Sequence, residues 1–283
     1  MHAALDLLAG RRLTVLTGAG VSTDSGIPDY RGPGAPVRTP MTFQEFVSGE
    51  AARQRYWARS FLGWSRMRHA EPNPAHHALA RLEAGGSVRL LVTQNVDGLH
   101  ERAGSTALCA LHGRIADVVC LACGRHTRRG VLQERMDRLN PGFAGRHSGA
   151  ADRPDGDVAL DATDGFRVPG CSSCGGVLKP DVVFFGENVP KPRVQRCYDA
   201  VEGSESLLVA GSSLTVLSGF RFVRHARALG VPVVIVNRGA TRGDPLATHK
   251  VETGCADFLT ALAAQETSRR TETRTPIPAS TSP

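Results

Sequence analysis

The stretch RLTVLTGAGVS, residues 12–22, decides the fold of this chain. It opens with an apolar, β-branched run typical of a buried strand, and a glycine-rich turn ends the run at Gly18. Four later runs share this pattern: VRLLVT (88–93), DVVFF (181–185), SLLVA (206–210) and VPVVIV (231–236). Helix-like or cysteine-containing segments separate the runs. The sequence therefore predicts an α/β fold built on a parallel, Rossmann-like sheet.

Small or polar residues follow every one of these runs. The turns are GAGVS from Gly18, QNVDGLH from Gln94, GE from Gly186, GSS from Gly211 and NRG from Asn237. In open α/β sheets, ligands bind outside the carboxyl ends of the strands. We therefore expect the five turns to converge on one cleft.

The turn GAGVS is similar to a dinucleotide-binding turn, in which glycines let the backbone approach a pyrophosphate. The third glycine of a GxGxxG pattern would fall at position 23, where this chain has Thr23. A hydride-transferring Rossmann enzyme is therefore poorly supported. By itself the turn is compatible with a phosphate cradle or with an ordinary tight connection between strand and helix.

Two CxxC pairs, CLAC at residues 120–123 and CSSC at residues 171–174, have the spacing of a closed zinc site. The alternative is that the four cysteines are core residues that share this spacing by coincidence. The paired spacing favours one structural zinc, held by Cys120, Cys123, Cys171 and Cys174. We assign no nucleophilic role to the three remaining cysteines, which are Cys109, Cys197 and Cys255.

These features predict one domain over residues 1–265. Its Rossmann-like parts span about 1–33, 85–115 and 180–265. A smaller zinc-binding and helical lobe, about 34–84 and 116–179, is inserted, with the zinc site within 120–174. The polar, proline-containing segment 266–283 is expected to be a disordered tail.

Composition narrows the class of protein. The chain has 283 residues, of which 41% are apolar, and a net charge of +7 that is spread without a dense basic block. It has no apolar run long enough to span a membrane and no secretory signal pattern. We therefore expect neither nucleic-acid nor membrane binding. The thiols favour the cytoplasm. The oligomeric state stays open, with a monomer as the default.

Seven motifs in this order resemble the sirtuin family of NAD-dependent protein lysine deacylases. They are GAGVSTDSGIPDYRG (18–32), TQNVDGLH (93–100), LHG (111–113), the two CxxC pairs, KPDVVFFGE (179–187), GSSLTV (211–216) and VNRG (236–239). The resemblance covers residues 5–262. The segments GVLQERMDRLNP, PDGDV and NPAHHAL are similar to the class II, mitochondrial-type branch, here in a bacterial-like form.

The resemblance implies an enzyme that moves an acyl group from lysine to ADP-ribose and releases nicotinamide. In sirtuin chemistry the acyl-lysine oxygen attacks the nicotinamide ribose, and a ribose hydroxyl is then deprotonated. His112 would be the general base and Asn95 the second catalytic residue. NAD would be the co-substrate, and acyl-lysine proteins or peptides the partners. The implied NAD-binding residues are Gly18, Ala19, Gly20, Ser22, Asp29, Tyr30, Arg31, Gln94, Asn95, Asp97, Gly211, Ser212, Ser213, Asn237, Arg238, Gly239 and Cys255.

Several alternatives stay open at this point. Asp97 could cap the following helix, and Asn95 could be a turn residue. A mono-ADP-ribosyltransferase would use the same NAD site, and a non-catalytic NAD sensor is a third possibility. In this family the substrate peptide adds as a β-strand, which implies backbone contacts for residues 182–187.

The acyl preference is also open, whether for acetyl, glutaryl, lipoyl or longer groups. One branch of the family holds succinyl-type groups with a Tyr-x-x-Arg pair. Tyr56 and Arg59 have this spacing, but they lie about one helical turn further from EPN (71–73) than the family pair. The nearer position holds Phe61, Gly63 and Trp64.

Overall fold

A parallel sheet forms the larger lobe of the computed structural model, which describes residues 1–30, 40–147, 156, 158–160 and 163–274. Its strand order is β3-β2-β1-β7-β8-β9, and every pair is parallel. The strands are β1 (Leu13–Thr17), β2 (Val88–Thr93), β3 (Leu108–Ala110), β7 (Ser206–Ala210), β8 (Val233–Val236) and β9 (His249–Val251). The two central strands, β1 and β7, are fully buried, as their uninterrupted apolar runs predict.

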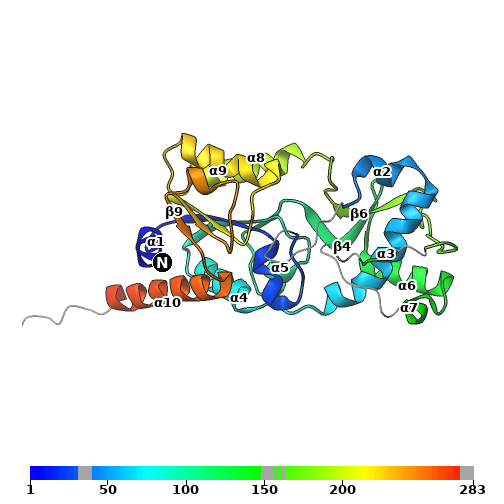
Figure 1. Ribbon diagram of the computed structural model, residues 1–283, viewed down its shortest axis with the longest axis horizontal. Coiled ribbons are helices and arrows are strands. Elements are labelled where there is room, and N and C mark those ends of the chain that lie inside the picture. Colours follow the sequence, from blue (N-terminus) through cyan, green and yellow to red (C-terminus); the bar gives the residue numbers. More distant parts are fainter. Residues whose placement is uncertain (31–39, 148–155, 157, 161–162, 275–283) are drawn as a thin grey trace, which may run out of the picture.

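Helices cover both faces of this sheet, as Figure 1 shows. One face packs against α1 (His2–Leu8), α4 (Pro74–Ala84) and α10 (Cys255–Arg274). The other face packs against α8 (Lys191–Glu202) and α9 (Leu217–Ala228). The side chains of neighbouring strand residues point to opposite faces of the sheet. Leu207 packs in the core under α8 and α9, and Leu208 packs in the core under α1, α4 and α10. The short helix α5 (Leu99–Arg102) follows β2.

The smaller lobe contains a second sheet, antiparallel and ordered β5-β4-β6. Its strands are β4 (Gly113–Cys120), β5 (His126–Arg128) and β6 (Leu178–Val182). The helices α2 (Phe43–Ser48), α3 (Glu50–His69), α6 (Arg129–Leu139) and α7 (Phe143–Arg146) complete it. Its core is aromatic, built around Phe46, Trp57, Phe61 and Phe143. Three short 3-10 helices, η1 (Ala19–Val21), η2 (Thr23–Ser25) and η4 (Asp244–Leu246), lie in connections of the larger lobe.

The α/β fold with a parallel sheet is confirmed, but the sequence assigns one run to the wrong sheet. DVVFF (181–185) is predicted as a parallel strand, whereas β6 ends at Val182 and pairs antiparallel with β4. The physical reason is its surroundings, because Val182 and Phe184 face the aromatic core of the small lobe. The short strands β3 and β9 take places in the parallel sheet that the sequence does not predict.

Two predicted boundaries also differ. The sequence places the small lobe up to residue 84, but α4 packs on the large sheet through Ala78, Leu79 and Leu82. The predicted disordered tail begins at residue 266, but α10 continues to Arg274, and Glu266 is buried. Residues 275–283 lie outside the described part. No helix of the described residues has both the length and the apolar character needed to cross a bilayer.

Candidate active site

A cleft of about 1160 Å³ lies at the carboxyl ends of the parallel strands. The turns after β1, β2, β7 and β8 line it on the side of the large lobe, and residues 182–189 line it from the β6 end. The predicted convergence of the five turns is therefore found. The predicted site residues on this lining are Gly18, Ala19, Gly20, Ser22, Asp29, Tyr30, Gln94, Asn95, Asp97, His112, Gly211, Ser212, Ser213, Asn237, Arg238, Gly239 and Cys255. Arg31 lies outside the described residues.

Glycines bring the turns after β1 and β7 into direct contact. A Cβ on Gly18 would lie 2.7 Å from the Gly211 oxygen, and one on Gly20 would lie 2.9 Å from the Gly211 Cα. Gly211 itself has a φ of 62°, a conformation that side chains disfavour. The two turns therefore form one backbone surface at the floor of the cleft.

A hydrogen-bond network ties the turn after β2 to the turn after β1. Ser22 Oγ donates to Asp97 Oδ2 at 2.7 Å, and Asn95 Nδ2 donates to Ser22 Oγ at 3.0 Å and to the Gly18 oxygen at 3.1 Å. Asp97 Oδ1 also accepts from Leu99 N at the start of α5. Asp97 thus accepts a hydrogen bond at the start of α5 and also lines the cleft. Burial raises the pKa of its carboxyl.

A second contact joins the turns after β2 and β7. Ser212 Oγ donates to Gln94 Oε1 at 2.7 Å and accepts from Leu214 N at 3.3 Å. Leu214 has a φ of 56° and is fully buried, so packing holds a non-glycine residue in the left-handed region. The GSS turn is therefore rigidly placed.

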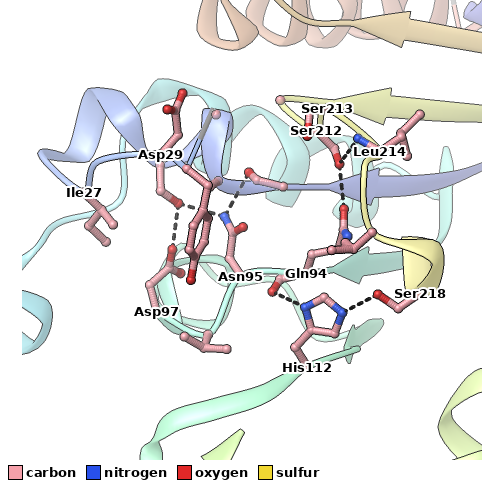
Figure 2. Close-up of a pocket in the computed structure, with 18 of the residues that line it drawn as sticks. Ile27, Asp29, Gln94, Asn95, Asp97, His112, Ser212, Ser213, Leu214 and Ser218 are labelled. Carbon is pink, nitrogen blue, oxygen red and sulfur yellow. Dashed lines mark hydrogen bonds between the residues drawn. The ribbon is translucent and has the colours of Figure 1, made fainter. Parts of the chain in front are cut away.

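His112 lies between the lobes with both ring nitrogens hydrogen-bonded (Figure 2). Nδ1 is 3.0 Å from the Gln94 carbonyl oxygen, and Nε2 is 2.8 Å from Ser218 Oγ. Burial lowers the pKa of His112 to about 4, against the raising effect of the Gln94 carbonyl, and the Arg193 cation lowers it further. The imidazole is therefore neutral near pH 7.

Sequence reasoning misses Ser218, the partner of His112 on the cleft wall. Ser218 lies in the first turn of α9 and is 106 positions away from His112 in the chain. Its only sequence signal is its place just after GSSLTV. Sequence reasoning also misses Ile27 and Met67, which form an apolar part of the lining together with Val182 of the predicted peptide segment.

Tyr56 and Arg59 do not reach this cleft. The Tyr56 ring packs against Phe46 and Phe184 in the small-lobe core, at centroid distances of 5.3 and 5.2 Å. Arg59 Nε donates to the Leu160 oxygen at 2.8 Å. In this conformation the pair contacts small-lobe residues instead of the cleft.

The segment after β6 is held in place by an ion pair between buried Lys179 and half-buried Glu187. Lys179 Nζ lies 3.0 Å from Glu187 Oε2 and donates to the Val182 oxygen at 2.6 Å. Glu187 Oε2 also accepts from Phe184 N at 2.9 Å. Val183 N donates to the His112 oxygen at 2.8 Å. The segment predicted to receive a peptide is thus braced against both β6 and the histidine.

The four cysteines of the CxxC pairs meet in the small lobe, with all sulfurs within 4.8 Å of one another. Two of the Sγ–Sγ distances are 3.5 and 3.9 Å. A tetrahedral zinc with 2.3 Å bonds needs sulfurs about 3.8 Å apart, so the four cysteines fit this metal. Each pair is followed by a left-handed glycine, Gly124 at 70° and Gly175 at 71°. The cysteines do not line the cleft, which makes the site structural.

Comparisons with known proteins agree with this geometry. NAD-dependent protein deacetylase 1 of Mycobacterium avium (strain 104) is 55% identical over 260 residues, covering 91% of this chain and 92% of that protein. NAD-dependent protein deacetylase 1 of Streptomyces coelicolor is 51% identical over 262 residues, covering 91% and 87%.

Solved structures show the same likeness. A structure described as Sir2-p53 peptide-NAD+ has a TM-score of 0.73 and 31% identity, covering 95% of this chain and 99% of that one. Another, on the structural basis for sirtuin substrate affinity, has a TM-score of 0.75 and 30% identity, covering 94% and 97%. The model of the Sir2 family matches residues 18–218, and this chain belongs to that family.

Proposed function

We propose that this protein is an NAD-dependent protein lysine deacetylase, which transfers the acyl group of a modified lysine to ADP-ribose and releases nicotinamide. The observation that carries the proposal is the neutral His112 at the junction of the turns that line the cleft. A neutral imidazole can accept a proton from a substrate hydroxyl. The names of the two bacterial relatives supply the reaction class.

We assign the parts of NAD to the parts of the cleft. The glycine turns after β1 and β7 would hold the phosphates, because only glycine allows so close a backbone approach. Gln94, Asn95 and Asp97 would surround the nicotinamide and its ribose. The turn after β8 and the start of α10 would flank the adenosine. The remaining NAD contacts would come from Asp29, Tyr30 and Arg31.

We propose that the acyl group is uncharged. Ile27, Met67 and Val182 form an apolar part of the cleft lining, and Arg59 is turned toward the Leu160 oxygen. A carboxylate placed among apolar side chains loses its hydration, and without a charged or hydrogen-bonding partner nothing compensates this free-energy cost. An acetyl-lysine peptide is therefore expected to react at least roughly tenfold faster than a glutaryl-lysine peptide, about 1.4 kcal/mol. Equal rates would contradict an uncharged preference.

The peptide is expected to lie along residues 182–187 as an added strand, with contacts mainly through the backbone. The solved Sir2 structure with a p53 peptide supports a peptide substrate. We also infer a cytoplasmic location, where the seven cysteines, none of which forms a disulfide here, stay reduced.

The test is nicotinamide release by the zinc-loaded protein with and without an acetyl-lysine peptide. The proposal expects release that depends on the acyl group, an O-acyl-ADP-ribose product by mass spectrometry, and loss of that product in His112→Ala. Stable transfer of label from NAD to protein would instead favour an ADP-ribosyltransferase. Tight NAD binding without turnover would favour a sensor.

A further inference from the structure

We propose that Ser218 is a proton relay between the NAD ribose and His112. The inference rests on the function proposed above and adds to it a residue and a proton path. It starts from the hydrogen bonds that both ring nitrogens of His112 make (Figure 2).

The partners of the ring fix the direction of each hydrogen bond. A backbone carbonyl only accepts, so Nδ1 donates its hydrogen to the Gln94 oxygen at 3.0 Å. In the neutral ring Nε2 then has a lone pair and no hydrogen. The contact between Nε2 and Ser218 Oγ, 2.8 Å long, therefore has the serine hydroxyl as donor.

The lone pair that makes His112 a base is consequently directed at Ser218. Nε2 has one lone pair, whereas a serine hydroxyl has one hydrogen and two acceptor lone pairs. Ser218 and His112 both line the cleft. A ribose hydroxyl that enters the cleft can donate to Ser218 Oγ while Ser218 keeps donating to Nε2. Such a chain strengthens each of its hydrogen bonds.

The relay moves two protons in one direction. The ribose O–H bond breaks and its proton bonds to Ser218 Oγ. The former hydroxyl proton of Ser218 moves to Nε2, and the ring becomes an imidazolium. The ribose oxygen keeps the electron pair of the broken bond for its attack on the acyl carbon. Ser218 ends as it began, so no further reactant is needed.

The test compares Ser218→Thr with Ser218→Val, which have nearly the same shape and differ by the hydroxyl. We expect the acyl-transfer rate of the Ser218→Val variant to be on the order of 100-fold lower than that of the Ser218→Thr variant. This difference lies within the rate acceleration that a positioned proton-transfer group contributes. Nicotinamide exchange, which precedes the proton transfer, should be alike in both. His112→Ala should behave as the Val variant does, and Ser268→Ala, on the exposed side of α10, should behave as wild type.

A proton inventory in mixtures of light and heavy water gives a second readout. The wild-type and Thr enzymes should show the curved dependence of two protons in transit, and the Val enzyme a linear one. Equal acyl-transfer rates in Thr and Val, whether both high or both low, would overturn the relay. A wild-type enzyme without acyl-dependent nicotinamide release would instead overturn the proposed function, so the two failures are distinguishable.

Discussion

His112 keeps its neutral form to unusually low pH for an imidazole. Burial brings its pKa to about 4, and Arg193 is the charged group that acts on it. Because the neutral ring is the form that we propose as the base, we expect activity to be retained above this pKa and lost below it. We expect kcat/KM to be insensitive to this group from about pH 5.5 to pH 8. A pH–rate profile checks this, and a loss of activity centred near pH 6.5 would contradict it.

His76 and His100 form a buried imidazole pair apart from His112, with ring centroids 4.7 Å apart. Burial lowers their pKa values to about 4 and about 3. Below pH 6.5 the unfolded chain therefore binds more protons than the folded chain. As the pH falls from 6.5 toward 4, the free energy of unfolding decreases by about 1.4 kcal/mol per pH unit for each proton that only the unfolded chain binds. Above pH 6.5 the two histidines cause no such loss.

His100→Gln is expected to remove about one proton from this pH dependence of the free energy of unfolding. Urea denaturation between pH 5 and 7.5 measures it. His2→Gln, an exposed substitution, is the matched control and should leave the slope unchanged. An unchanged slope in His100→Gln would show that the pair does not titrate in this range.

At the scale of elements, the partly buried pair of Lys179 and Glu187 orders the segment after β6. The Lys179 side chain is 5% exposed, and the carboxylate also caps Phe184 N. Glu187→Gln keeps the shape and removes the charge, which loosens the segment. We expect the KM for peptide to rise roughly tenfold, the equivalent of about 1.4 kcal/mol, with the KM for NAD within twofold.

Steady-state kinetics with each substrate varied in turn separates these effects. Glu202→Gln, which alters an exposed pair with His225, is the control. A parallel rise in both KM values would mean that the pair supports the fold generally and does not position the peptide.

The zinc site is a second element-scale feature. Cys123→Ser should abolish zinc binding and loosen the small lobe, because structural zinc contributes directly to folding. The chain has two tryptophans, Trp57 and Trp64, and both lie in α3 of the small lobe. Their fluorescence should therefore change with zinc loss, in step with the metal content. Unchanged fluorescence in the zinc-free protein would contradict this.

At the scale of the whole molecule, α10 links distant parts of the large lobe. Glu266 is buried and accepts hydrogen bonds from Gly10 N, after α1, and from Ser87 Oγ, before β2. Glu266→Ala leaves these donors unpaired. We expect a loss of about 1–3 kcal/mol in the free energy of unfolding. Chemical denaturation measures it, with exposed Ser268→Ala as control, and equal stabilities of the two variants would contradict the role.

Much of the fold and the cleft can be predicted from local sequence. Buried parallel strands require uninterrupted apolar runs, and a close approach of two backbones requires glycine. Strands β1 and β7 and the turns after them can therefore be predicted from RLTVLTGAGVS and SLLVAGSS. The spacing of the two CxxC pairs likewise predicts a zinc site. All these signals lie within a few neighbouring residues.

Tertiary structure decides what depends on partners far away in the chain. An apolar run has the same appearance in parallel and antiparallel sheets, so only the pairing with β4 assigns β6 to the small lobe. The polar segment from Glu266 continues α10 because the buried Glu266 carboxylate accepts hydrogen bonds from Gly10 N and Ser87 Oγ. Ser218 meets His112 across 106 positions because α9 begins, and β3 ends, at the same cleft, a proximity that no local pattern encodes.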